Sequence, residues 1–546
     1  MISRRSFFKG SAVVSAAAGF PHLARSADVL HAIAGQKPRH IIHLVADGMS
    51  MGTLTLADAF SRLTRKRGLT WMELYKNPAA VQALMNMRSL NSLVTDSSAA
   101  SSSWGSGSRV LNGVINQLPG KKNLKTLYEL FADIGWKRGL VTTTEITHAT
   151  PAGFAANVDN RDTGTAIAVQ YLERKVDVLL GGGKIFFDPA KRKDKRDLKK
   201  DYLAAGYVVM ETLDQLKAAP NDQRWLGTFA SSHLPYTIDH LASRKLIATV
   251  PTLAVMTRAA LDWLGRENHF ILQVEGGLVD HACHNCDAAS ALHDMIAFDD
   301  ALEVCLEFQK KNPDTLITVT TDHGNGNMAL NGAGTLYCDS SKHFANVAKV
   351  KCSFPEIIKH LKKTNVAVDP GADPLNADEG GDVAKLGAAN QFTDEPPVGA
   401  KPPPKPVEPP KPKEQIPTYK EIMQIIPELT GCKVSQRRSE WLIPFLSNKG
   451  HAMYEIMNNE MVQLGQLLAN YYGIGWTGNA HTADYVPLIA LGPGAELFRG
   501  FVENVDVFRH YTSLAGIDFK NPTVPLTAQV GREAGDVENT AAYALA

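Results

Sequence analysis

Two apolar, strand-like runs in this chain of 546 residues each lead into a cluster of acids and histidines. The runs cover 270–280 and 315–321. The polar residues at their carboxyl ends are Asp280, His281 and His284 for the first run, and Asp322 and His323 for the second. Imidazole and carboxylate groups are ligands that zinc takes in proteins, and open α/β sheets bind ligands beyond the carboxyl ends of their strands. The pattern therefore predicts a metal site in an α/β fold, which suits hydrolysis assisted by metal ions.

Further short runs rich in β-forming residues alternate with helical patterns along the chain. They cover 39–47, 139–144, 176–180 and 485–491. In 295–308, apolar residues recur at steps of three and four, as on one face of a helix. This alternation predicts a three-layer α/β fold, in which helices flank a central, mainly parallel sheet on both faces.

The composition excludes some classes of partner. The formal net charge is +1, so the chain has no basic excess that would favour nucleic acid. No run after the N-terminal segment is long and apolar enough to span a bilayer, so we expect no stable membrane anchor. Six cysteines are too few for a disulfide scaffold of this size. For Cys283 and Cys286, which flank His284, packing or a local disulfide is the favoured interpretation.

The first residues have the pattern of an export signal. A twin-arginine motif at 3–9 contains Arg4 and Arg5, and an apolar run at 12–20 follows it. Small residues near Ser26 suit cleavage after that position. The segment 1–26 is therefore predicted to be a signal peptide that engages the twin-arginine export machinery, with a periplasmic or secreted mature protein.

The rest of the chain divides into parts of different composition. Residues 370–417 are rich in Gly and then Pro, which predicts a flexible, solvated insert. Residues 418–474 have a helical pattern, and we expect helices that cap the sheet near the site. Residues 27–369 and 475–546 are predicted to form one catalytic domain around the insert.

Six short motifs, taken in order, point to one family. They are Asp47-Gly-Met, Thr95-Asp-Ser97, His148-Ala-Thr150-Pro, the segment 274–284, Thr321-Asp322-His323-Gly, and His481-Thr-Ala-Asp-Tyr-Val-Pro. Together they cover most of 39–340 and 475–495. In this order and spacing the set resembles the alkaline phosphatase family.

The resemblance implies a role for each matching residue. The serine nucleophile falls on Ser97, with Ser98 as the less favoured neighbour, and Arg161 falls where the family binds phosphate. Two zinc sites are implied, one at Asp280, His284 and His481 and the other at Asp47, Asp322 and His323. A magnesium site is implied at Asp47, Thr150 and Glu275, with supporting places for His148 and His281.

The expected function follows from these roles. We expect an exported hydrolase that cleaves small phosphate monoesters through a phosphoserine intermediate and releases phosphate and an alcohol. The resemblance also allows a homodimer. Two alternatives stay open: a phosphodiesterase or sulfatase-like relative on the same fold, and an exported phosphate- or metal-binding protein without turnover.

Overall fold

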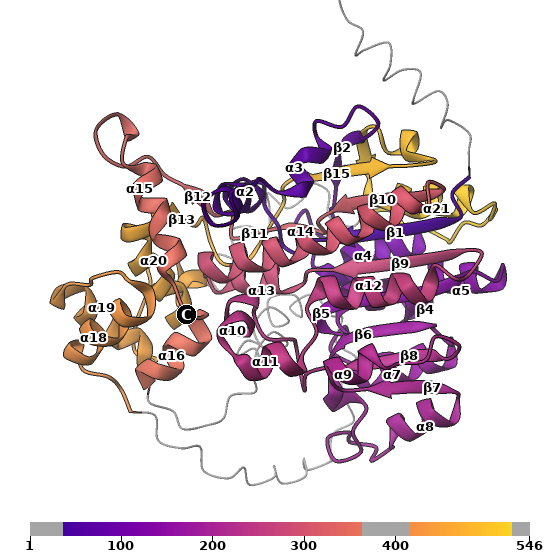
Figure 1. Cartoon of the computed structure of the whole chain (residues 1–546), viewed down its shortest axis with the longest axis horizontal. Helices are drawn as coiled ribbons and strands as arrows, with labels where there is room; N and C mark the ends of the chain where they lie inside the picture. The colour runs from indigo at the N-terminus through magenta and orange to yellow at the C-terminus, as the bar shows by residue number, and fades with distance from the viewer. Residues whose placement is uncertain (1–36, 363–414, 527–546) are drawn as a thin grey trace, which may run out of the picture.

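A ten-stranded sheet forms the centre of the protein (Figure 1). The structure is a computed structural model that describes residues 37–362 and 415–526. The expected signal, 1–26, and residues 370–414 of the expected insert lie outside these ranges. In spatial order the strands are β16 (Gly500–Glu503), β2 (Val81–Asn86), β15 (Val486–Leu491), β10 (Thr315–Thr320), β1 (His40–Val45), β9 (Phe270–Glu275), β5 (Lys137–Glu145), β6 (Val178–Gly182), β8 (Arg224–Thr228) and β7 (Tyr207–Met210).

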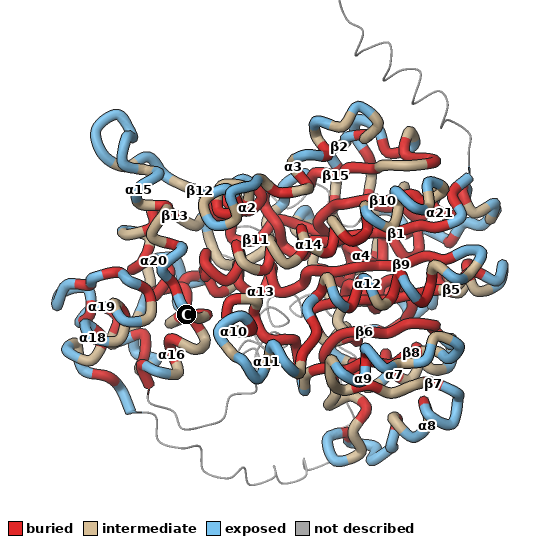
Figure 2. Tube along the Cα trace, in the orientation of Figure 1, coloured by how far each residue is buried: buried red, intermediate tan, exposed pale blue. Residues whose placement is uncertain are grey.

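The sheet is mainly parallel, as the sequence predicts. β15 runs antiparallel to both of its neighbours, β10 and β2, while the other strands of this sheet share one direction. The central strands β1, β9 and β10 are buried along their whole length (Figure 2). Strands covered on both faces read as nearly continuous apolar runs, which is why these segments stand out in the sequence.

Helices cover both faces of the sheet and form two separate apolar cores. In β1, Ile42 and Leu44 join one core and Ile41 and Val45 the other, because successive side chains of a strand point to opposite faces. The first core contains residues of α2 (Met51–Arg65), α3 (Thr70–Leu74), α9 (Leu213–Lys217), α10 (Thr237–Ala242), α12 (Leu253–Leu264), α13 (Leu278–His284) and α14 (Ala288–Lys311). The second contains residues of α4 (Ser97–Ser106), α5 (Leu127–Asp133), α6 (Ala149–Ala155), α7 (Gly164–Glu173), α8 (Leu198–Ala204) and α21 (Asn504–Leu514).

The expected strand at 270–280 is only partly correct. β9 ends at Glu275, and Asp280, His281 and His284 lie on the short helix α13 instead. Gly276 and Gly277 separate the two elements. Glycine has no side chain that could pack on the face of the sheet, so it weakens the strand at this point. Asp280 and His284 are therefore four residues apart on one face of a helix.

The segment from Tyr419 to Tyr472 forms helices beside the sheet. Its helices are α18 (Tyr419–Thr430), α19 (Gln436–Leu446) and α20 (Glu460–Tyr472). They pack with one another and with α16 (Phe354–Lys362), and Figure 1 shows this group at the left of the sheet. A Cβ at Gly465 of α20 would lie 2.7 Å from the carbonyl oxygen of Cys286, so α20 lies close to the end of α13.

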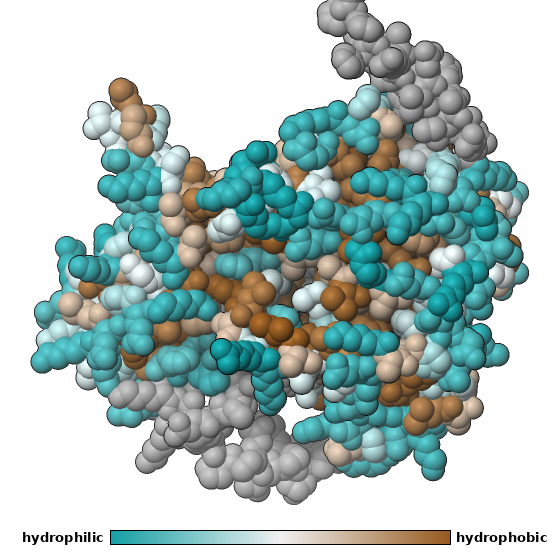
Figure 3. All heavy atoms as spheres, viewed as in Figure 1, coloured by the Kyte–Doolittle hydropathy of each residue, from teal (hydrophilic) through white to brown (hydrophobic). Residues whose placement is uncertain are grey.

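Smaller elements complete the fold. α11 (Arg244–Thr249) follows α10, and a loop after β12 (Ala329–Leu330) leads to α15 (Ser340–Phe344). That loop projects from the body and exposes Leu336 and Tyr337, which are 86% and 75% accessible; the face in Figure 3 is otherwise largely hydrophilic, with scattered hydrophobic residues. Short two-stranded ladders join β12 to β13 (Ile474–Gly475) and β3 (Gln117–Leu118) to β4 (Lys122–Asn123).

All six cysteines are free thiols in the structure. Cys283 and Cys286 are buried and unbonded to each other, so the packing interpretation holds and the local disulfide is wrong. Burial raises the pKa of both thiols, which keeps them protonated and unreactive.

α4 and α6 cross at close range because glycine lies at the contact. A Cβ at Gly105 would lie 1.8 Å from the carbonyl oxygen of Gly153, and one at Gly153 would lie 2.3 Å from Ser101 Oγ. The Ser101 hydroxyl also donates to the Thr150 carbonyl at 2.6 Å. The run of small residues in α4 thus lets the helix that begins at Ser97 pack directly on the one that carries Thr150.

This crossing gives a prediction. Gly105→Val should lower the free energy of unfolding by about 2–3 kcal/mol, because the new side chain overlaps the Gly153 backbone, which cannot move away cheaply. Ser103→Ala, in the same helix, is the matched control: it removes only a hydroxyl bonded to the Ala99 carbonyl and should cost less than about 1 kcal/mol. Denaturant unfolding measures both, and equal values for the two variants would contradict the close crossing.

Candidate metal centre and active site

Neighbouring parallel strands place three acids at one edge of the sheet. Val45 of β1 lies opposite Glu275 of β9 and opposite Thr320 of β10. Asp47 and Asp322 each follow two residues after Val45 and Thr320, so the register brings them side by side. The backbone N–H of Gly48 donates to Asp322 Oδ1 at 3.1 Å, which ties the two turns together.

Gly48 lets α13 approach the end of β1. Its φ is +67°, in the left-handed region, and a Cβ there would lie 2.2 Å from Asp280 Oδ1. Glycine alone avoids both the backbone strain and the overlap. As a result, the helix that carries Asp280 and His284 lies directly over Asp47.

A short ladder brings His481 to the same place from far along the chain. β11 (Gly324–Asn325) pairs with β14 (His481–Thr482), and Asn325 lies opposite His481. Asn325 also donates its side-chain N–H to Asp280 Oδ1 at 2.6 Å. The turn after Asp322 and His323 therefore positions a ligand from α13 and a ligand from β14 together.

The first group of predicted ligands, Asp280, His284 and His481, is brought together in the structure. His284 Nε2 lies 3.2 Å from Asp280 Oδ2 and 3.1 Å from His481 Nε2, and His481 Nε2 lies 3.8 Å from Asp280 Oδ1. Ligand atoms around a tetrahedral zinc are about 3.3 Å apart, given Zn–N bonds of about 2.0–2.1 Å. The two nitrogens and the Asp280 carboxylate thus have a spacing that fits a metal ion such as zinc.

Hydrogen bonds on the far side of each ring define which nitrogen faces this group. His481 Nδ1 lies 2.9 Å from the Thr95 carbonyl and His284 Nδ1 lies 2.7 Å from the Asn479 carbonyl. A carbonyl only accepts, so each Nδ1 carries a proton, and Nε2 is the nitrogen that each ring directs at the other. Burial lowers the pKa of His481 to about 3, with His323 adding to the effect. Two ring nitrogens 3.1 Å apart are held either by a shared proton or by a cation.

The second group, Asp47, Asp322 and His323, is almost fully buried. His323 Nε2 lies 3.1 Å from Asp322 Oδ2 and 3.7 Å from Asp47 Oδ1. Asp322 Oδ1 accepts the backbone N–H groups of Gly48 and His323, so its other oxygen points into the group. Within the described residues, Asp47 Oδ1 and Asp322 Oδ2 have no hydrogen-bond donor, although both are buried. Buried acceptors without a donor fit metal ligands.

The third group lies on the other side of Asp47. The Thr150 hydroxyl donates to Asp47 Oδ2 at 3.4 Å, and Glu275 Oε2 accepts from the Thr144 hydroxyl at 3.3 Å. Glu275 Oε1 is buried without a donor among the described residues. Asp47, Thr150 and Glu275 offer only oxygen atoms, which are the ligands that magnesium prefers.

His148 lies close enough to this group to be a ligand, with its Nδ1 3.9 Å from Glu275 Oε1. Its Nε2, however, lies 3.1 Å from Arg161 Nη2. A guanidinium only donates, so Nε2 accepts and Nδ1 of the neutral ring carries the proton. Burial, with Arg161 and His281 beside it, lowers the pKa of His148 and keeps the ring neutral. This arrangement favours the supporting role expected for His148.

Ser97 lies against the second group, and Arg161 contacts the neighbouring Asp96. α4 begins at Ser97, and the Ser97 Oγ atom lies 3.2 Å from His323 Nε2. Asp96 caps the helix by accepting from the Ala99 N–H at 2.9 Å, and its other oxygen accepts from Arg161 Nη1 at 3.2 Å. Burial opposes ionisation of Asp96, yet Arg161 and the donors around it lower its pKa. The charged Asp96 thus holds a guanidinium one residue from the serine.

His281 lies in a cluster of imidazoles beside the third group. Its ring centroid is 5.7 Å from that of His148 and 4.4 Å from that of His233. The sequence predicts no role for His233, Asn325, Thr142 or Thr144, although Thr142 donates to Glu275 Oε2 at 2.5 Å. The threonines read as ordinary β-branched strand residues, and Asn325 as a turn residue, so the sequence carries no signal for their contacts.

Buried negative charge dominates the centre. Asp47, Glu275, Asp280 and Asp322 are each at most 4% exposed. Burial and the carboxylates of Asp322, Asp280 and Glu275 raise the pKa of Asp47 well above its ordinary value. Carboxylates so close together are stable as charged groups only beside cations. The donor set therefore fits divalent metals, with imidazole in two groups and oxygen alone in the third.

Comparison with known proteins agrees with this geometry. The family model for alkaline phosphatase matches residues 38–389.

The chain belongs to the alkaline phosphatase family.

Among known members, alkaline phosphatase 4 of Bacillus subtilis is 30% identical over 422 residues, which are 76% of this chain and 75% of that protein. The streptomycin-6-phosphate phosphatase of Streptomyces griseus is 32% identical over 336 residues, 54% of this chain and 75% of that protein. The crystal structure of Thermus thermophilus alkaline phosphatase has a TM-score of 0.76 and 30% identity, covering 93% of this chain and 96% of that one. The protein is accordingly an enzyme of a metal-dependent phosphatase family with the three-layer fold predicted from its sequence.

The export prediction is confirmed. The model for twin-arginine translocation signals matches residues 1–21, which indicates export across the membrane to the periplasm or beyond. Across 37–362 and 415–526, the structure has no helix with the length and apolar character needed to cross a bilayer.

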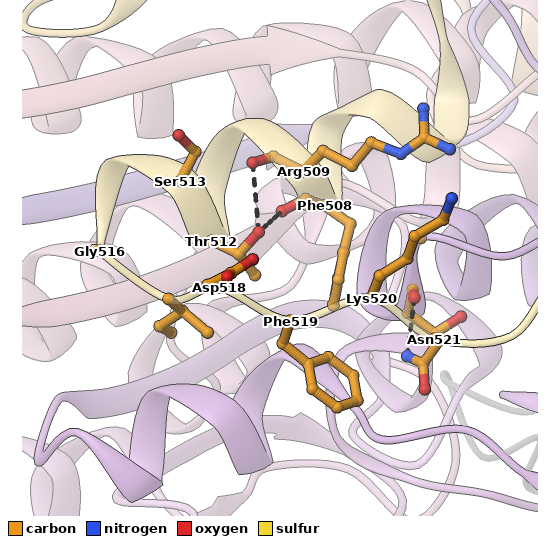
Figure 4. A pocket seen from close by; sticks show the side chains of 12 residues that line it. Phe508, Arg509, Thr512, Ser513, Gly516, Asp518, Phe519, Lys520 and Asn521 are labelled. Carbon is orange, nitrogen blue, oxygen red and sulfur yellow. Dashed lines mark hydrogen bonds between the residues drawn. The ribbon is translucent and has the colours of Figure 1, made fainter.

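A separate hollow lies at the opposite end of α4 (Figure 4). Its volume is about 520 Å³, and it is lined by Ser106, Gly107, α21 and the segment that follows α21. Because α4 has ten residues and rises about 15 Å, the hollow lies a helix length from Ser97. It contains none of the three ligand groups and is distinct from the alkaline phosphatase site.

The charge balance of the site predicts a response to metal removal. Treatment with a chelator should lower the melting temperature by about 10 °C or more, since bound metal stabilises only the folded state. This drop in melting temperature should be larger at about pH 8 than at about pH 6, because the pKa of Asp47 is raised. At the lower pH, protons compete with the metal for Asp47. At the higher pH, ionised Asp47 destabilises the metal-free fold.

Calorimetry before and after chelation measures this change. Adding Zn²⁺ and Mg²⁺ back should restore the original value. Asp47→Asn is the informative variant, because it removes the acid shared by two groups and should show a smaller drop on chelation. A melting temperature that chelation leaves unchanged would contradict the assignment of these residues as metal ligands.

Proposed function

We propose that the protein hydrolyses phosphate monoesters to inorganic phosphate and an alcohol, through a phosphoserine formed on Ser97. The observation that carries this proposal is the position of Ser97 Oγ, 3.2 Å from His323 Nε2 at the N-terminus of α4, next to three groups of potential metal ligands. Family membership supports the same activity. The twin-arginine signal supports action outside the cytoplasm on small phosphate esters.

Ser97 is the better nucleophile of the two adjacent serines. The Ser98 hydroxyl donates to Asp96 Oδ2 at 2.6 Å, so it is engaged in the helix cap. Ser97 Oγ faces His323 and the second group instead. The first turn of α4 also places the positive end of the helix dipole near the phosphate. These contacts support the assignment made from the sequence.

We propose two zinc ions and one magnesium ion as cofactors. Asp280, His284 and His481 would hold one zinc, Asp47, Asp322 and His323 the other, and Asp47, Thr150 and Glu275 the magnesium. When bound, these ions would supply positive charge that lowers the pKa of the Ser97 hydroxyl and offsets the charge of the phosphate. The residues themselves orient the donors: Thr95, Asn479 and Asn325 fix the rings and carboxylate of the first group.

Arg161 is proposed to bind the non-bridging oxygens of the phosphate. Asp96 and His148 orient its guanidinium beside Ser97, and the fork of donors matches phosphate geometry. A diester has fewer charged oxygens for such a fork, which favours a monoester over the diesterase alternative. The site also provides a nucleophile together with ligand groups, which argues against a binding protein without turnover.

The remaining assignments are proposed on the same basis. Residues 27–369 and 475–546 would form the catalytic domain, 370–417 the flexible insert and 418–474 the helical cap segment. A homodimer is the proposed assembly, and light scattering tests it.

The function predicts a ranking of substrates. Aryl phosphate should be hydrolysed faster than the bis-aryl phosphate and the aryl sulfate, with all three rates measured side by side on the metal-loaded enzyme. A higher rate on the diester or the sulfate would make one of the alternatives correct.

Ser97→Ala should lower kcat on the aryl phosphate by at least about 10³-fold, because it removes the nucleophile. Its zinc content should stay near that of the wild type. Ser98→Ala is the matched control and should keep most of the activity. Normal turnover by Ser97→Ala, or the larger loss in Ser98→Ala, would move the nucleophile away from Ser97.

Arg161→Ala should weaken phosphate binding more than metal binding. We expect the inhibition constant of inorganic phosphate to rise by about tenfold or more, since a charge-assisted pair contributes about 1.5–3 kcal/mol. Arg161→Lys keeps the charge but not the fork and should recover only part of the loss. Metal content, measured in the same samples, should be unchanged; an equal loss of metal would contradict this role.

A further inference from the structure

The first group of ligands lies on the solvent side of the centre. The side chains of His284 and His481 are 18% and 15% exposed, whereas those of Asp47, Asp322 and His323 are at most 1% exposed. Ser97 lies against the buried second group. If the proposed function is correct, the alcohol leaves from the side opposite Ser97 in an in-line displacement, past the first group and toward solvent.

One segment of the chain borders that side. Residues 476–481 lead into His481, and the Asn479 carbonyl accepts from the His284 ring at 2.7 Å. The preceding carbonyl, that of Gly478, accepts from the Cys286 thiol at 3.5 Å. The segment is thus tied to both imidazole ligands of the first group.

Tyr454 lies against this segment. Its Cε1 atom is 4.0 Å from the position of a Cβ on Gly478, which is ordinary van der Waals contact. The loop that carries Tyr454 is anchored by Met457, which packs with Cys286 and Val462 in a small apolar cluster of its own. The backbone N–H of Met457 donates to the Tyr454 carbonyl at 2.9 Å. These contacts position Tyr454 beside Gly478, three residues before Met457, which packs with Cys286 just beyond the end of α13.

The ring of Tyr454 is not used to build the core. The residue is 59% exposed, and the neighbouring Met453 is fully exposed. The structure shows no side-chain hydrogen bond for Tyr454 within its described residues. Large apolar groups exposed at the rim of a site are typical of ligand contacts, since covering an exposed ring with an organic group removes apolar surface from water.

We propose that Tyr454 is a specificity-determining residue that contacts the alcohol part of the substrate and favours monoesters of aromatic alcohols. The phosphate end is bound by groups that do not distinguish one ester from another. An aromatic ring that lies beyond the leaving oxygen can stack against Tyr454, while a short alkyl chain does not reach it. The substrate class that this rim fits is therefore a phosphate ester with a flat, apolar alcohol group.

The test compares kcat/KM for phenyl phosphate and ethyl phosphate in the metal-loaded, full-length enzyme. Tyr454→Ala should lower the phenyl-to-ethyl ratio by about threefold to tenfold, the range of an aromatic pair. Tyr454→Phe should keep the wild-type ratio, because the ring and not the hydroxyl makes the contact. Inhibition by inorganic phosphate should be the same in all variants, since phosphate has no alcohol part.

Tyr337→Ala is the matched control, because Tyr337 is also exposed but lies on the projecting loop before α15. It should leave the ratio unchanged. A phenyl-to-ethyl ratio within about twofold of wild type in Tyr454→Ala overturns the proposal, as does an equal change in Tyr337→Ala. Failure of the proposed function is a different result: the wild type would then turn over neither monoester, and the role of Tyr454 would fall with it.

Discussion

The structure depends on placing several charges where protein alone cannot balance them. Four carboxylates are buried at one edge of the sheet, and two imidazole nitrogens lie 3.1 Å apart. Burial and mutual repulsion raise the pKa of Asp47, which shows how strongly the site resists bare negative charge. Cations would remove this conflict, so metal binding would stabilise the folded site.

The fold makes this arrangement by simple means. Parallel strands end at the same edge, so equal spacing after β1 and β10 places Asp47 and Asp322 together. Gly48 then allows α13 to lie on top, and the glycine contact between α4 and α6 adds Ser97 and Thr150. The carbonyls of Thr95 and Asn479 accept hydrogen bonds from the Nδ1 atoms of the two histidine ligands, so both rings are oriented before any metal binds.

Much of the site was predictable because its residues sit in short motifs with strong local patterns. Asp322 and His323 follow an obvious buried strand, and Asp96 precedes a run of small residues that can begin a helix. The partners that orient them were not predictable. Asn325 resembles any turn residue, and Thr144 resembles any strand residue. Thr144 contacts Glu275, which lies more than a hundred residues away in the sequence, and Asn325 contacts Asp280 on a different element. The break at Gly276 was also missed, since the apolar pattern continues across it.

The sequence by itself determined the layered α/β class, the export signal and the kinds of side chain at the metal site. The fold class follows from local periodicity, the signal from its twin-arginine motif, and the ligand types from motifs that resemble those of the family. The family resemblance already implied that His481 joins Asp280 and that Ser97 is the nucleophile. Only the tertiary structure decided the contacts that position them: β14 pairs with β11, Ser98 donates to Asp96, and Tyr454 lies against Gly478. Those outcomes depend on long-range pairing and helix crossing, whose geometry is set by the packing of the whole chain and not by any one segment.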